Sequence, residues 1–96
     1  MGKSDMQRKV SMIERTAKLP MGHEVTFQWA PDAGFRFEWL PDVPNIRSIR
    51  HRRRFVTAYL REREAFGREV ATMIGGNVMF LNADGSMNVY SPLTNH

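Results

Sequence analysis

The chain has 96 residues, 42% of them hydrophobic and 25% charged, a composition typical of one globular domain with a single modest core. It has no cysteine and no apolar run of about 18 residues, which excludes disulfides, cysteine metal ligands and a membrane-spanning helix. The net charge of +4 is concentrated, because residues 46–75 hold eight arginines against three glutamates, and such a segment favours a polyanionic partner. We therefore expect a single cytoplasmic domain over residues 1–96 that does not contact membranes, with frayed ends at about residues 1–4 and 92–96.

The first twenty residues predict a short N-terminal helix. Ser4 followed by Gln7 is the pattern of a capping box. Hydrophobic residues then follow at helical spacing: Met6, Val10, Ile13 and Ala17. The helix is expected to run to about Lys18 and to stop before Pro20.

A β-hairpin is predicted next, because apolar and polar residues alternate on both sides of the turn sequence Pro31-Asp32-Ala33-Gly34. The apolar positions are Val25, Phe27, Trp29, Phe35, Phe37 and Trp39. One apolar face is what a sheet packed on a helix requires, so we interpret these aromatics as core. A stacking platform for nucleic-acid bases is the alternative. Trp39 is the candidate for an exposed aromatic contact.

A long helix is predicted from about Asn45, as N-cap, to Ile74, with Gly75-Gly76 as its left-handed stop. Its apolar side holds Ile49, Val56, Tyr59, Phe66, Val70 and Met73, flanked by Phe55, Leu60 and Ile74. The opposite side holds an arginine ridge, which comprises Arg47, Arg50, Arg54, Arg61 and Arg68. At about 1.5 Å per residue this helix is longer than a domain of this size is wide. It must therefore bend, with Gly67 as the candidate position, or project at its N-terminal end.

Two arginines, Arg52 and Arg63, fall on the apolar side of this helix. Arg63 lies among Tyr59, Phe66 and Val70, where an unpaired guanidinium is costly, so its stem is expected to lie over the aromatics with its head at the rim or paired to a carboxylate. The alternative is a helix–helix interface between two copies, in which an arginine at a heptad position sets the register.

The sequence Asn77–Pro92 predicts a second hairpin that turns at Ala83-Asp84-Gly85. Its first strand is a continuous apolar run, so both faces need cover, and Met79 and Leu81 join Arg52 and Arg63 as candidates for self-association. The order is therefore α-β-β-α-β-β. We expect an α+β fold in which both hairpins form one mostly antiparallel four-stranded sheet on the helices; two separate small sheets are the alternative.

No arrangement of residues predicts catalysis. The three histidines, His23, His51 and His96, lie far apart along the chain, and no metal site or cofactor is expected. The glycines of Gly75-Gly76 follow a helix, whereas a phosphate-binding loop precedes one. We expect a protein that is not an enzyme.

Three functions remain, and the first is a nucleic-acid-binding protein that contacts the phosphates of DNA or RNA. Its candidate contacts are Arg47, Arg50, Arg53, Arg54, Arg61 and Arg68. The alternative is a protein-interaction module, such as a small inhibitor or adaptor of phage or mobile-element type, whose same basic surface docks on an acidic or nucleic-acid-binding surface of a larger complex. The third is an assembly subunit that forms homo-oligomers.

Overall fold

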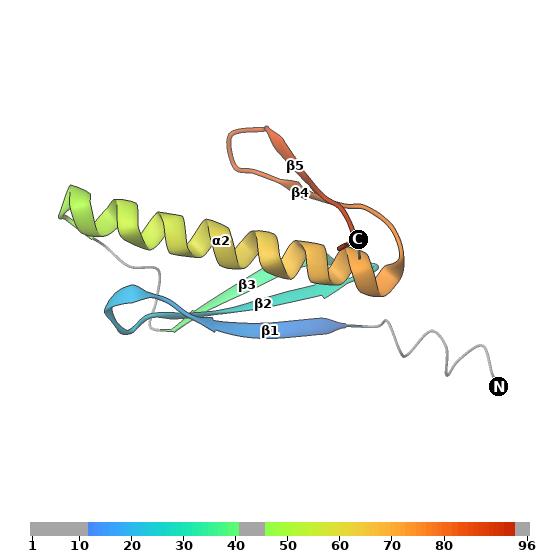
Figure 1. Ribbon diagram of the computed structural model, residues 1–96, viewed down its shortest axis with the longest axis horizontal. Coiled ribbons are helices and arrows are strands. Elements are labelled where there is room, and N and C mark those ends of the chain that lie inside the picture. The colour runs from blue at the N-terminus through green and yellow to red at the C-terminus, as the bar shows by residue number, and fades with distance from the viewer. Residues whose placement is uncertain (1–11, 41–45, 94–96) are drawn as a thin grey trace.

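The computed structural model describes residues 12–40 and 46–93. The elements are β1 (Ile13–Lys18), a 3-10 turn η1 (Pro20–Gly22), β2 (Glu24–Ala30), β3 (Gly34–Leu40), α2 (Ile49–Ile74), β4 (Val78–Leu81) and β5 (Met87–Tyr90). The fold is α+β with the order β-β-β-α-β-β. The antiparallel sheet β1-β2-β3 lies on one side of α2, and the β4–β5 hairpin forms a separate two-stranded sheet (Figure 1).

The predicted N-terminal helix is wrong over the part of it that the structure describes. Residues 13–18 form β1, which pairs antiparallel with β2, with Ile13 opposite Trp29 and Ala17 opposite Val25. Ile13 and Ala17 are buried and are four residues apart, a spacing that one face of a helix and one face of a strand both satisfy. Residues 4–11 of the prediction lie outside the described residues.

The first hairpin is confirmed. β2 and β3 pair antiparallel up to Ala30 opposite Gly34, and Gly34 has the positive φ of 72° that favours glycine at the end of this turn. The alternation puts Val25 and Phe27 against α2, where both are fully buried. The hairpin therefore contributes the side of the core that faces α2.

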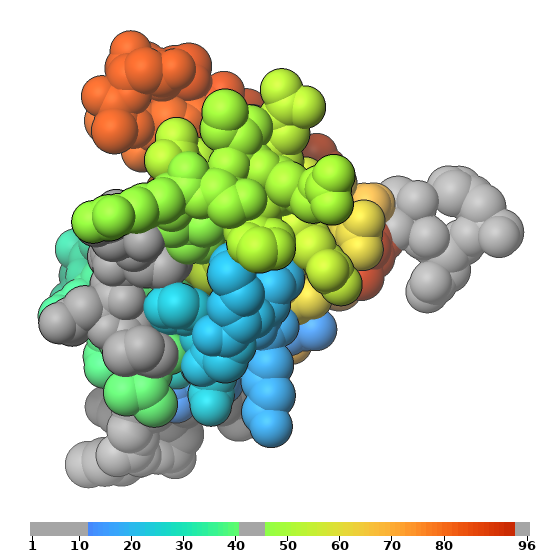
Figure 2. Space-filling model, turned by 90° about the vertical axis from the view of Figure 1, so that its left-hand side faces the viewer, coloured from blue at the N-terminus to red at the C-terminus, as the bar shows by residue number. Residues whose placement is uncertain are grey.

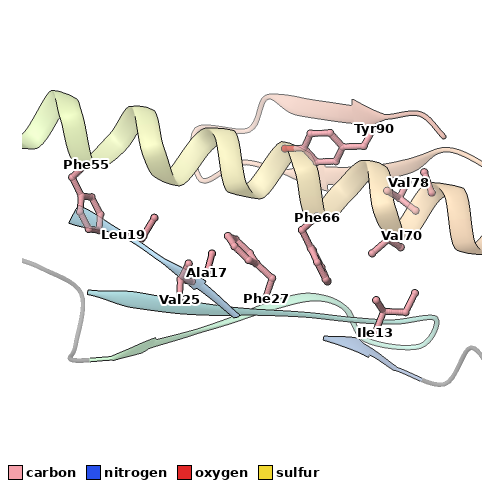
Figure 3. Packing of buried hydrophobic residues seen from close by; sticks show 11 residues of the cluster. Ile13, Ala17, Leu19, Val25, Phe27, Phe55, Phe66, Val70, Val78 and Tyr90 are labelled. Carbon is pink, nitrogen blue, oxygen red and sulfur yellow. The ribbon is translucent and has the colours of Figure 1, made fainter. Parts of the chain in front are cut away.

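The centre of the core is a contact between the sheet and α2. The rings of Phe27 and Phe66 stack with centroids 5.5 Å apart, and both side chains are fully buried. Figure 3 shows Phe55 and Phe66 pointing from α2 toward the sheet at two levels of the helix. Burial of rings of this size dominates the stability of a small domain, so these contacts fix how α2 lies on the sheet.

The helix starts and stops for identifiable reasons. The N-cap is Ser48, whose hydroxyl accepts a hydrogen bond from the His51 N–H at 3.4 Å; the predicted N-cap, Asn45, lies outside the described residues. Gly75 ends the helix in the left-handed conformation, and its N–H donates to the Ala71 carbonyl at 2.9 Å, which confirms the predicted stop.

The expected apolar side of α2 is confirmed in part. Its predicted members Val56, Leu60, Met73 and Ile74 are exposed. Phe55, Phe66 and Val70 are buried, whereas the Ile49 side chain is 66% exposed. Every residue from Ile49 to Arg54 is exposed, so the first buried side chain of α2 is Phe55. The N-terminal turns of α2 therefore project beyond the core, as expected for one of the two ways to accommodate its length (Figure 1).

The second hairpin turns where the sequence predicts. Gly85 has a φ of 90°, and the Asp84 carboxylate accepts hydrogen bonds from the Ser86 hydroxyl at 2.6 Å and from the Ser86 N–H at 2.9 Å. These two bonds hold the pKa of the Asp84 carboxyl below its usual value.

The prediction of one four-stranded sheet is wrong, and the alternative of two separate sheets holds. Phe80 of β4 meets the rings of Phe35 and Phe37 at centroid distances of 5.6 and 5.4 Å. Side chains therefore fill the space between β4 and β3, and the two strands are too far apart for backbone hydrogen bonds. The described part of the C-terminal tail is held on α2, because the Leu93 N–H donates to the Thr72 hydroxyl at 2.8 Å.

Candidate nucleic-acid interface

The arginine ridge follows a largely solvent-exposed side of α2. Arg50, Arg54 and Arg61 are exposed, Arg68 is partly buried, and Arg47 is exposed just before the helix begins. Figure 2 looks onto the end of the molecule where α2 starts. Side chains of its first turns stand out there between the β4–β5 hairpin and the η1 turn.

The densest positive charge surrounds an open hollow of about 430 Å³ between α2 and η1. It is lined by Pro20, Arg53, Arg54, Thr57, Ala58 and Arg61. Among the described residues, none that lines this hollow carries a carboxylate. Within residues 12–40 and 46–93, none of the arginines of this hollow forms an ion pair, and the same holds for Arg47 and Arg50. The hollow therefore offers three guanidinium groups to an anion.

A second open hollow, of about 530 Å³, continues along α2 and shares Arg61 with the first. Its other charged residues are Arg15, Arg68, Glu64 and Glu69, so its positive charge is largely balanced. Glu64 and Arg68 are one turn apart but form no ion pair. Of the candidate contacts, Arg61 and Arg68 line this mixed hollow, and Arg61 also lines the basic one. The N-terminal half of α2 is therefore the more basic half.

Arg15 explains why the glutamates of α2 do not cancel the ridge. Its guanidinium donates to Glu69 at 3.1 Å and lies 3.8 Å from Glu62, so a residue of β1 takes up both carboxylates. All three side chains are partly solvent-exposed, so the pairs add little stability, but they neutralise charge locally. Sequence reasoning missed this role because it placed Arg15 on a helix.

Both arginines of the apolar side are bound within the chain. Arg52 is exposed, and its Nε and Nη2 donate to the Ile46 carbonyl at 3.2 and 2.8 Å, which fixes the segment that enters α2. Arg63 lies 4.3 Å from the centre of the Phe80 ring.

The head of Arg63 donates to the hairpin, with Nε 3.1 Å from the Tyr90 hydroxyl and Nη2 3.3 Å from Asn88 Oδ1. Arg63 therefore fastens the β4–β5 hairpin to α2, a use of its planar fork that lysine does not reproduce.

The aromatic side chains belong to the hydrophobic core or pack against it. Trp39, the candidate exposed contact, is half-buried and packs on Phe55 and Tyr59 at centroid distances of 5.8 and 5.3 Å. All ten aromatic side chains (six Phe, two Trp and two Tyr) fall in the described ranges, and none of them is exposed. A wide stacking platform is not built on this surface.

Met79 and Leu81, the remaining candidates for self-association, are 64% and 66% exposed. They share the outer face of the hairpin with Val89 and Met87, which lie directly opposite them across the β4–β5 pair and are also exposed. These four described residues of the outer face are all apolar.

Among the residues that the structure describes, no three His, Cys, Asp or Glu side chains are grouped closely enough to hold a metal ion. None of the described helices is long and apolar enough to cross a membrane. No family model, curated protein or solved structure matches this chain.

Proposed function

We propose that this protein is a non-enzymatic nucleic-acid-binding protein that holds phosphates on the N-terminal half of α2. The observation that carries the proposal is the hollow where Arg53, Arg54 and Arg61 meet, whose described lining residues include no carboxylate. Guanidinium groups bind phosphate oxygens through two parallel hydrogen bonds, which favours arginine at such a site.

The extent of the surface suits several phosphates. Arg50 and Arg61 are 11 residue steps apart along the helix, about 16 Å at 1.5 Å per residue, and Arg54 lies between them. Contacts of this kind give affinity with little dependence on sequence, because phosphates carry no base information. Binding is expected to weaken steeply with salt, with a slope of log K against log salt of about −4 for four or five contacts.

The test is fluorescence anisotropy of the purified chain with labelled DNA and RNA at a series of salt concentrations. We expect micromolar or tighter binding at low salt and the slope given above. A flat salt dependence, or no binding to any nucleic acid by the folded protein, would contradict the proposal.

Charge-reversal variants make the test specific to the surface. Arg54→Glu/Arg61→Glu removes two ridge contacts, and we expect it to reduce the salt slope by about 2 and to abolish tight binding. Lys18→Glu/Arg36→Glu is the matched control, because both residues are exposed on strands of the sheet and the net charge changes equally. Equal losses in the two variants would mean that net charge, and not this surface, drives binding.

The alternative of a protein partner shares the same surface. A folded wild-type chain that binds no nucleic acid would redirect the proposal to an acidic protein surface, on which exposed arginines act as anchors. The same pair of variants then tests that interface.

A further inference from the structure

We infer that the nucleic acid is duplex DNA in the B form and that the projecting N-terminal turns of α2 enter its major groove. This inference rests on the proposed function, since it specifies the ligand of the same basic surface. It is drawn from the shape of the end of α2, from the arginines on it and from the placement of the aromatic residues.

The projecting end has the dimensions of a groove-binding element. Residues 49–54 are all exposed and extend about 9 Å along the helix axis before the first buried side chain, Phe55. A helix with side chains is about 10–12 Å across, and the B-DNA major groove is about 12 Å wide and 8.5 Å deep. The end of α2 fits that groove without any change in the core.

The arginines are distributed to match such a pose. Arg50 and Arg53 lie on the projecting turns, where they reach the floor or walls of the groove. Arg61 lies two to three turns further along, over the core, where it meets phosphates at the groove edge. One helix therefore supplies both groove contacts and backbone contacts, as in known groove-binding helices.

The other nucleic acids lack a matching feature. Single strands are held by bases stacked on exposed aromatic rings, and every aromatic side chain of this protein is buried or half-buried. Duplex RNA in the A form has a deep and narrow major groove that protein side chains cannot read. The projecting turns would be excluded from it, and only edge contacts such as that of Arg61 would remain.

The test compares a mixed-sequence 20-base-pair DNA duplex, the RNA duplex of the same sequence and the single DNA strand at one salt concentration. We expect the DNA duplex to bind about tenfold or more tightly than either of the others. A second probe is the same DNA duplex carrying glucosylated 5-hydroxymethylcytosine, whose sugars fill the major groove. We expect it to bind about tenfold more weakly than the unmodified duplex.

Variants assign the preference to the projecting turns. Arg50→Ala/Arg53→Ala is expected to weaken DNA binding and to bring the DNA and RNA affinities within about threefold of each other. Arg61→Ala is the comparison, and it should weaken both by the same factor while the preference remains. Equal binding of both duplexes by the wild type, or unaltered binding of the glucosylated DNA, overturns the inference and leaves the proposed function standing. No binding to any nucleic acid overturns both.

Discussion

At the scale of single residues, Gly67 determines how closely β5 approaches α2. Gly67 lies within an unbroken helix, where a β-carbon would come less than 3.0 Å from three atoms of the Tyr90 ring. Gly67→Ala improves helix propensity by about 1 kcal/mol, yet we expect a net loss of about 1–3 kcal/mol in the free energy of unfolding, because Tyr90 must move. Urea denaturation of the wild type and of Gly67→Ala measures this change in the free energy of unfolding. Gly76→Ala, where nothing lies within 4 Å, is the control and should change stability by less than about 0.5 kcal/mol.

The ionisation of Tyr59 makes the stability of the fold depend on pH. Burial raises the pKa of its hydroxyl above the usual 10.0, an effect that the neighbouring Arg63 guanidinium only partly offsets. Because the pKa is higher in the folded state, the stabilisation is fully present below pH 10.0 and is lost as the pH rises through the folded-state pKa.

We therefore expect the free energy of unfolding of the wild type to fall above pH 10.0, and to fall less in Tyr59→Phe, which keeps the ring against Phe27. Denaturation at a series of alkaline pH values is the measurement. Identical profiles for the two proteins would show that Tyr59 ionises as easily in the folded state as in the unfolded one.

At the scale of elements, the first turns of α2 should be dispensable for stability. We expect Phe55→Ala to cost about 3–5 kcal/mol, because it removes a buried ring that packs on Trp39, and Ile49→Gln to cost less than about 0.5 kcal/mol. Thermal or urea unfolding of both variants measures the contrast. A large loss in Ile49→Gln would mean that the N-terminal turns pack on the rest of the domain.

The strands show which elements the sequence can predict. Gly34 and Gly85 occupy positions with positive φ, so the two turns are encoded in a few adjacent residues and both hairpins were predictable. β1 was not predictable, because Arg15 occupies a position on the face of the strand that points toward α2. An apolar residue at that position would have completed the alternating pattern of a strand. The long stem of Arg15 carries the charge past the sheet to Glu69, a contact that depends on tertiary structure.

The candidate site likewise has some features that the sequence predicts and others that depend on tertiary contacts. The periodic spacing of Arg54 and Arg61 is a local property of a helix, so their common face was predictable. The balanced charge around Arg68 and the attachment of Arg63 to Tyr90 depend on distant strands, so no local pattern indicates them.

At the scale of the whole molecule, we expect self-association through the outer face of the hairpin. The face holds Met79, Leu81, Met87 and Val89, all of them apolar, and a second copy offers an identical apolar face that can pair about a twofold axis. Analytical ultracentrifugation should show a mass that rises with concentration for the wild type and a monomer for Leu81→Glu. A monomer mass for the wild type at high concentration would contradict this prediction. Nucleic-acid binding by Leu81→Glu should persist, because Leu81 does not line either of the two hollows along the ridge.

The separation of the two sheets has a consequence for local unfolding. No backbone hydrogen bonds join β4–β5 to β3, and a two-stranded hairpin is marginally stable by itself. The hairpin can therefore open as one unit while β1, β2 and β3 stay paired on α2. Amide hydrogen exchange should then be faster for Met79 and Val89 than for Thr26 and Gln28. Arg53, Arg54 and Arg61 are arranged by α2 and η1, so the basic surface should persist in a molecule whose C-terminal hairpin is transiently unfolded.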